Sequence, residues 1–150
     1  NRYIAVSSIP FVVNSANKAR WSFLAPAKFL GNFARTYNGF LEFDLTSFAG
    51  DFTSNVVPNP KTFVEISCST CGGGSGITLA QRNITYLGDT RHFKFTLNEL
   101  PINEWKKDPQ NMFQTQWTSP TYTEFFQVLS AISKIAIYPD ITTGQESVGV

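Results

Sequence analysis

The sequence predicts an all-β fold, a jelly-roll β-sandwich with one short α-helix packed at the edge or end of a sheet. Three observations support this prediction: short runs in which apolar and polar residues alternate, turn-rich pieces between those runs, and one stretch with apolar residues at helical spacing. The chain has 150 residues, 42% of them hydrophobic and 15% charged, which fits one globular domain rather than a disordered segment.

Five runs are expected to form strands because their apolar residues recur at every second position. The clearest run directs Leu41, Phe43 and Leu45 to one face and Phe40, Glu42 and Asp44 to the other. Short strands separated by Gly- and Pro-containing turns are typical of a sandwich or jelly roll. The predicted strands are residues 40–45, 62–67, 77–80, 92–97 and 134–138.

A helix is predicted over residues 121–133. Thr121 and Glu124 have capping-box spacing, in which each side chain can bond to the other residue's backbone N–H. A second short helix or tight turn is expected over residues 27–31, where Pro26 can start it and Gly31 can end it. The apolar stripe of the longer helix is expected to face the core, and it consists of Phe125, Phe126, Val128, Leu129 and Ile132.

The two cysteines, Cys68 and Cys71, directly precede a glycine-rich loop over residues 72–76. A thioredoxin-like redox site needs a helix that starts at the motif, and three consecutive glycines oppose that helix. A zinc site needs four ligands, so with His92 the chain would still require a partner chain. A disulfide between the two cysteines is the favoured interpretation, and it indicates an oxidising compartment.

Other features also favour an extracellular, secreted protein. Asn83, Ile84 and Thr85 form an acceptor triplet for an N-linked glycan on Asn83.

The net charge is +1 without a basic run, so nucleic acid is not an expected partner. No run approaches the roughly 20 apolar residues that cross a bilayer, so no membrane span is expected.

The chain resembles the laminin domain IV module, also called the L4 or laminin B domain. The most specific block is the run from Trp21 to Asn32, with its Ala-Pro-x-x-Phe-Leu-Gly pattern, followed by the turn and strand over residues 37–43. Further matches follow in the same order as in the family: residues 93–99, Trp105, residues 121–129 and residues 134–138. The resemblance covers residues 20–150, which leaves residues 1–19 as an N-terminal strand or extension.

The resemblance implies a jelly-roll sandwich similar to carbohydrate-binding modules, in matrix proteins without enzymatic activity. Two features depart from the family pattern: Asn38-Gly39 stands in place of a glycine pair, and residues 68–76 form an atypical insert. Cysteine-rich repeats of the epidermal-growth-factor type, which usually flank the module, are not present in this sequence.

The sequence supports a catalytic or metal-binding function less well than a structural one. His92 is the only candidate base, on the polar side of its strand, and Glu42 with Asp44 is the only obvious carboxylate pair; both are expected to be solvated surface groups. No catalytic residue, metal site or cofactor is therefore predicted. Structural calcium is the one ion considered, with candidate ligands Asp44, Asp51 and Asp140.

Trp117 is the candidate for stacking on a sugar ring because its neighbours are polar. Trp21 and Trp105 belong to the family pattern and are expected in the core. The alternative for Trp117 is a partly buried loop tryptophan beneath the helix.

The N-terminal segment is rich in residues that favour strands. It is either the first strand of the module or a donor strand that pairs with the sheet edge of another copy. The residues of this candidate assembly segment are Tyr3, Ile4, Val6, Ile9, Phe11 and Val13.

Taken together, these residues predict a secreted structural module of a matrix, coat or fibril. Its expected partners are matrix proteins or further copies of itself, and self-assembly by strand donation is one expected mode. A carbohydrate-binding module is the alternative, and an enzyme is not predicted.

Overall fold

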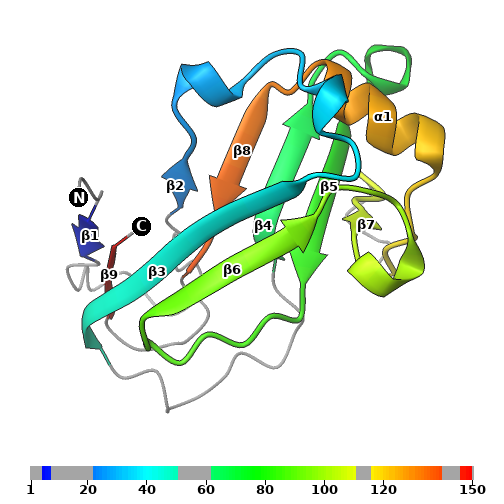
Figure 1. Cartoon of the computed structure of the whole chain (residues 1–150). Coiled ribbons are helices and arrows are strands. Elements are labelled where there is room, and N and C mark those ends of the chain that lie inside the picture. Colours follow the sequence, from blue (N-terminus) through cyan, green and yellow to red (C-terminus); the bar gives the residue numbers. More distant parts are fainter. Residues whose placement is uncertain (1–4, 8–21, 51–61, 111–115, 140–145, 150) are drawn as a thin grey trace.

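The structure is a computed structural model that describes residues 5–7, 22–50, 62–110, 116–139 and 146–149. These residues form two antiparallel sheets and one α-helix (Figure 1). The four-stranded sheet has the order β1 (Ala5–Ser7), β9 (Glu146–Gly149), β3 (Phe40–Gly50), β6 (Arg91–Thr96). The five-stranded sheet has the order β2 (Phe23–Leu24), β8 (Lys134–Ile137), β4 (Thr62–Cys68), β5 (Ile77–Arg82), β7 (Lys106–Lys107). The predicted all-β class with one short helix is confirmed, whereas the jelly-roll arrangement stays a prediction.

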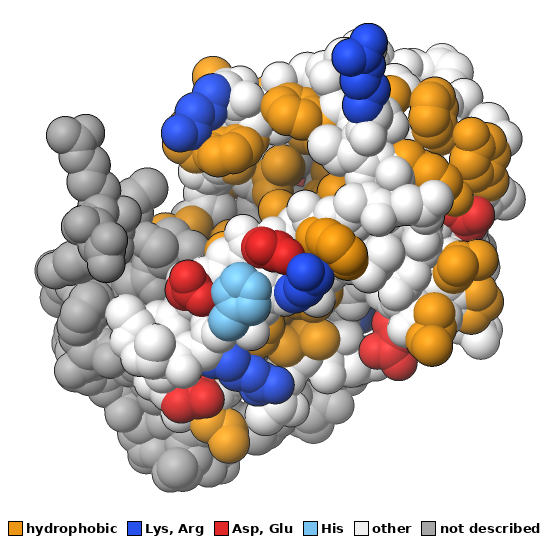
Figure 2. Space-filling model, viewed as in Figure 1, with side chains coloured by type: hydrophobic (Ala, Val, Ile, Leu, Met, Phe, Trp, Pro, Cys, Tyr) orange, Lys and Arg blue, Asp and Glu red, His pale blue; other side chains and the backbone are white. Residues whose placement is uncertain are grey.

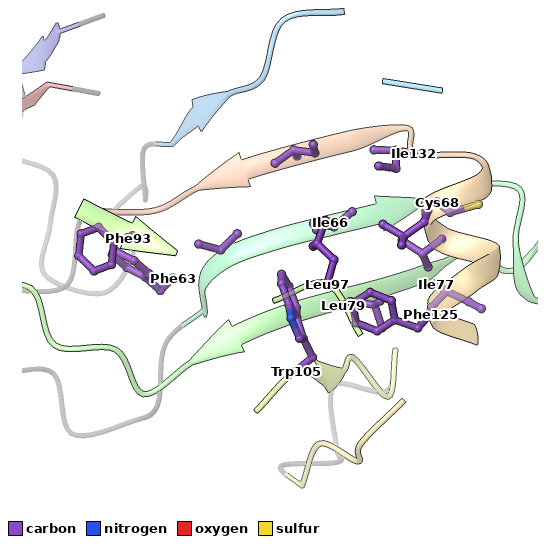
Figure 3. Packing of buried hydrophobic residues seen from close by; sticks show 14 of the residues in the cluster. Phe63, Ile66, Cys68, Ile77, Leu79, Phe93, Leu97, Trp105, Phe125 and Ile132 are labelled. Atoms are coloured by element: carbon purple, nitrogen blue, oxygen red, sulfur yellow. The ribbon is translucent and has the colours of Figure 1, made fainter. Parts of the chain in front are cut away.

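Aromatic side chains join the two sheets face to face. Phe63 of β4 packs against Phe93 of β6 with ring centroids 4.9 Å apart, and Phe93 stacks on Phe43 of β3 at 5.4 Å. Towards the helix, Trp105 meets the edge of Phe125 at 5.7 Å. Figure 3 shows this core as one layer of apolar side chains above β4 and β5. The core therefore depends on residues far apart in the chain, as burial of large rings between sheets requires.

The alternation predicted for residues 40–45 is observed. Leu45 is fully buried and Phe43 is half-buried in the core, while Glu42 and Asp44 are exposed. All five predicted strands are present, each with at least one end shifted. Strands β3, β4 and β5 continue beyond the predicted end, β6 is displaced by one residue, and β8 ends one residue earlier than predicted.

Strand β4 departs from strict alternation. Its pairing with β5 shifts register between Thr62 and Val64, which marks a β-bulge or similar irregularity. As a result, the consecutive residues Phe63 and Val64 are both fully buried, whereas Glu65 is half-buried. An alternating pattern places these two residues on opposite faces, so the irregularity brings an additional large ring into the core.

Helix α1 (Tyr122–Ser130) has the predicted capping box. The Glu124 backbone N–H donates to Thr121 Oγ1 at 3.3 Å, and the Thr121 backbone N–H donates to the Glu124 carboxylate at 2.9 Å. The helix packs against β4 and β5 through three buried residues, Phe125, Val128 and Leu129.

Two details of the helix prediction are wrong. The helix ends three residues before Ser133, because Ile132 pairs instead with Gly31 and the Ser133 N–H donates to the Ser67 carbonyl. Phe126 lies at the surface, 37% exposed, because it is turned away from the side of the helix that carries Phe125 and Leu129.

Short 3₁₀ turns complete the described structure. The helix or turn expected over residues 27–31 is a 3₁₀ turn, Ala27–Phe29, and Gly31 follows it at a φ of +102°. The remaining 3₁₀ turns are Ala34–Thr36, Gly72–Gly74 and Pro101–Asn103.

Candidate interaction surfaces

The outer face of β3 and β6 carries paired charges. Glu42 lies opposite Lys94 with an O–N distance of 2.7 Å, and Asp44 lies opposite His92 at 2.8 Å (Figure 2). The hydrogen bond from Lys94 lowers the pKa of the Glu42 carboxyl. Lys94 Nζ also lies 3.7 Å from the centre of the exposed Phe40 ring. This face is a solvated surface on which Glu42 pairs with Lys94 and Asp44 bonds to His92.

Within the described part of the chain, the candidate base His92 has no nucleophilic side chain as a hydrogen-bond partner. Among the described residues, the hydrogen bond of the His92 ring goes to Asp44 and none goes to a serine, threonine or cysteine. A nucleophilic site requires such a group beside the base. The carboxylates of Glu42 and Asp44 bond to different side chains of the neighbouring strand, Lys94 and His92.

Trp117 is half-buried, and Arg82 covers one face of its ring. The guanidinium carbon of Arg82 lies 4.1 Å from the ring centre, a cation–π contact, and burial lowers the pKa of this arginine. The adjacent Thr118 forms a bridge with Lys107, which fixes the backbone beside the ring. The face of the Trp117 ring that Arg82 covers is therefore not open to a sugar. The other tryptophan within the described residues, Trp105, is in the core as expected, 1% exposed.

Cys68 and Cys71 are joined by a disulfide, with Cα atoms 5.5 Å apart. Cys68 ends β4, and Cys71 lies beneath α1, where its Sγ is 3.4 Å from the Gln127 carbonyl oxygen. Gly73 has a φ of +70°, a conformation that favours glycine, in the turn that follows. The bridge therefore closes the β4–β5 hairpin at the point where it supports the helix.

Asn83 is exposed and directly follows β5, with a φ of +61°. Thr85, the third residue of the acceptor triplet, is also exposed. The structure therefore leaves the triplet accessible at the surface. Asn83 also follows Arg82, so this candidate glycan site adjoins the Trp117 contact along the chain.

Part of the N-terminal segment forms a strand within its own chain. Ala5–Ser7 is β1, antiparallel to β9, and Val6 pairs with Val148. The other members of the candidate assembly segment, Tyr3, Ile4, Ile9, Phe11 and Val13, lie outside the described residues. Trp21, Asp51 and Asp140 also lie outside them.

A cluster of aromatic side chains at α1 was not identified from the sequence. Tyr37 meets Tyr122 edge-on at 5.2 Å, and Tyr122 stacks on Phe126 at 5.8 Å. The Tyr37 hydroxyl donates to Glu99 at 2.6 Å, and this hydrogen bond raises the pKa of Tyr37 to about 12. The available signal was the i, i+4 spacing of Tyr122 and Phe126, which places both on one side of a helix.

No three His, Cys, Asp or Glu side chains lie together in a way that could hold a metal ion within the described part of the chain. Nor does any described helix have the length and apolar character needed to cross a bilayer.

The fold and its surfaces define a β-sheet module with paired charges on one sheet and an aromatic cluster at its single described helix. The chain belongs to the Laminin B (Domain IV) family, which it matches over residues 22–149. Among solved structures it is similar to the L4b domain of human laminin alpha-2, with a TM-score of 0.66 and 16% sequence identity. That match covers 87% of this chain and 66% of the laminin chain. No curated protein matches the sequence.

Proposed function

We propose that this chain is a structural module of a secreted matrix, coat or fibril protein that acts through contacts with other proteins. Membership in the Laminin B (Domain IV) family over residues 22–149 carries this proposal. The disulfide supports an oxidising compartment, and the exposed acceptor triplet at Asn83 is compatible with passage through the secretory pathway. The aromatic cluster at α1, in which Tyr122 and Phe126 are exposed and Tyr37 is half-buried beside them, is the kind of surface that protein partners use.

The proposal is tested by directing the chain through the secretory pathway of cultured cells behind a cleavable leader. We expect the protein to be recovered in the detergent-insoluble extracellular matrix. A secreted domain of similar size from another family serves as the control. Recovery of both proteins only in the medium would contradict the proposal.

Material from the same cells tests the glycan on Asn83. We expect removal of N-glycans to lower the apparent mass of the wild type and of Thr85→Ser, which keeps the acceptor hydroxyl. Asn83→Gln and Thr85→Ala should show no shift. An unmodified wild type would contradict the glycan assignment.

Carbohydrate binding is the second candidate function, and the half-buried ring of Trp117 favours it. A stacked aromatic ring carries a large part of such a contact, so Trp117→Ala should abolish binding on a glycan array. Trp117→Phe, which keeps an aromatic face, should retain part of it. Absence of wild-type binding on a broad array would remove this candidate.

Self-assembly by strand donation is proposed as one form of the protein contacts. Since β1 lies on β9 of its own chain, donation would exchange the same pairing between two copies. Deletion of residues 1–13 should then abolish assembly, and an added peptide of those residues should occupy the vacant edge. Unchanged assembly after the deletion would contradict strand donation.

A further inference from the structure

The loop over residues 98–104 exposes large apolar side chains. Ile102 is 85% exposed and Leu100 is 51% exposed, and both belong to the segment around the 3₁₀ turn Pro101–Asn103. Exposed apolar side chains of this size gain free energy when a partner covers them.

Buried hydrogen bonds hold this loop in place. The buried polar side chains among the described residues are Gln81, 2% exposed, and Asn98, 5% exposed, and both bond to the loop. Asn98 Oδ1 accepts from the Leu100 backbone N–H at 3.1 Å and also from the Asn103 side chain. Gln81 Nε2 donates to the Asn103 carbonyl at 2.5 Å. The loop is therefore fixed from beneath while its apolar residues face outward, so little conformational freedom is lost on binding.

Two carboxylates flank the exposed apolar residues. Glu99 and Glu104 form no ion pair with any described residue, and Glu104 is exposed at a φ of +55°. Glu99, Leu100, Ile102 and Glu104 are called the acidic–apolar loop below. Its chemistry matches a surface that offers apolar contact and positive charge.

The chain itself carries such a surface. Lys28 is exposed without an ion pair among the described residues, and its Nζ lies 4.9 Å from the centre of the Phe29 ring. Phe29 is 46% exposed, and nearby Leu24 at the end of β2 is 60% exposed. Leu24, Lys28 and Phe29 are called the basic–apolar patch below.

The two surfaces lie on opposite sides of the molecule. In Figure 1 the turn Ala27–Phe29, in blue, is at the upper left, and the turn Pro101–Asn103, in yellow-green, is at the lower right. Within one chain they do not meet. We propose that the acidic–apolar loop of one copy binds the basic–apolar patch of a second copy, which rests on the proposed structural function and names a contact for it.

A contact of this kind is head-to-tail. After two copies have paired, one copy still has a free patch and the other a free loop, so the contact repeats and builds an open chain unless the rotation between copies closes a ring. The surfaces are small, so each contact is weak and belongs to the transient class. Its charged part weakens as salt is added, because both charges are at the surface.

Charge reversal provides the test, with self-association measured by sedimentation velocity from about 10 µM to about 1 mM, the range in which weak affinities are visible. We expect the wild type to associate as concentration rises. Glu104→Lys and Lys28→Glu should each weaken association about fivefold, because an attractive surface pair becomes a repulsive one. The double variant K28E/E104K, and an equimolar mixture of the two single variants, should regain wild-type association.

Matched controls separate this contact from net charge and from general stickiness. K28E/D89K has the same net charge as K28E/E104K, but Asp89 lies in another exposed turn, so this variant should stay weakened. Ile102→Ser should weaken association about tenfold. Leu87→Ser, at a side chain that is 60% exposed elsewhere, should not weaken it. Circular dichroism establishes that each variant is folded.

Two results would overturn the inference. One is a wild type that stays monomeric throughout the concentration range. The other is a self-association that the single charge reversals leave unchanged, or that their combination does not restore. Unchanged association is the result expected if strand exchange alone joined the copies. Either result leaves recovery in the matrix as an independent test of the proposed function.

Discussion

The outer faces of the two sheets carry the same kind of ion pair in different surroundings. On β3 and β6, the side chains of Glu42 and Lys94 are 43% and 49% exposed. On β4 and β8, the side chain of Glu65 is only 17% exposed and that of Lys134 is 42% exposed, with 2.9 Å between them.

The second pair is also part of a network. Glu65 accepts hydrogen bonds from Ser67 and from the Tyr138 hydroxyl, each at 3.0 Å. Burial lowers the pKa of Lys134, but the hydrogen bonds to Glu65 and Tyr138 and the negative charge of Glu65 together outweigh it, so the net pKa is raised. Water competes for charges at the surface, so solvent exposure, more than pair geometry, decides how much each pair stabilises the fold.

The largest expected effect tests the core that both sheets share. Phe63→Ala should lower the free energy of unfolding by about 3–5 kcal/mol, because the ring is fully buried against both Phe43 and Phe93. Chemical denaturation measures the loss, and amide hydrogen exchange should show both sheets weakened together. Weakening of the five-stranded sheet alone would mean that the sheets are not one cooperative unit.

The half-buried network should respond strongly to loss of its carboxylate. Glu65→Ala should lower the free energy of unfolding by about 1–2 kcal/mol, because Lys134 loses its charged partner beside a partly buried surface. Glu65→Gln, which keeps a hydrogen-bond acceptor, should cost less. Equal losses for Glu65→Ala and Glu42→Ala in denaturation experiments would contradict the contrast between the two faces.

The capping box of α1, which packs on the five-stranded sheet, makes the stability of the fold depend on pH. Partial burial opposes ionisation of Glu124, but hydrogen bonds from Lys107 and Thr121 outweigh it and lower the pKa from the ordinary value of 4.5. The folded state thus binds the proton less tightly than the unfolded chain. The stabilisation that ionised Glu124 gives the folded state is complete above about pH 4.5. It is lost as pH falls through the lowered pKa of Glu124 in the folded state.

Two variants test this assignment. Thr121→Ala should lower the free energy of unfolding by about 1 kcal/mol at neutral pH. Glu124→Gln should flatten the acid limb of a plot of stability against pH. An acid limb that is identical in the wild type and in Glu124→Gln would assign the dependence to other carboxylates.

The smallest effect is expected on the exposed face of β3 and β6. Glu42→Gln and Asp44→Asn should leave the melting temperature within experimental error, because their pairs with Lys94 and His92 are open to solvent. A measurable drop for either variant would show that this face is covered in solution.

Local signals made the central strands and the helix start predictable. The alternation in residues 40–45 and the Thr121–Glu124 capping box are both read over a few neighbouring positions. The shift of register at Thr62 and Val64 cannot be read from neighbouring positions, because it depends on the pairing of β4 with β5. Likewise, the two-residue strands β2 and β7 exist only through their partners β8 and β5.

The candidate surfaces also divide into those that a short stretch of sequence shows and those that depend on contacts between distant residues. Asn83 and the Cys68–Cys71 pair are short motifs that can be read directly. The loop held by Gln81 and Asn98 depends on contacts between residues far apart in the chain: Gln81 bonds to Asn103, 22 positions away, and Asn98 bonds to Asn38, 60 positions away. Periodicity alone also placed Phe126 in the core, since it cannot distinguish the rim of an apolar stripe from its centre.

The pairing of β1 with β9 has a mechanical consequence. Ala5 lies opposite Gly149 and Ser7 lies opposite Ser147, so the N-terminal end of one strand is beside the C-terminal end of the other. Tension across these two ends pulls on the first hydrogen bonds before the rest and unzips β1 from β9 one bond at a time, while β9 stays attached to β3. Release of the three residues of β1 lengthens the chain by about 10 Å. Under load on these two ends, the pairing of β1 with β9 would therefore be strained before the aromatic core between the sheets.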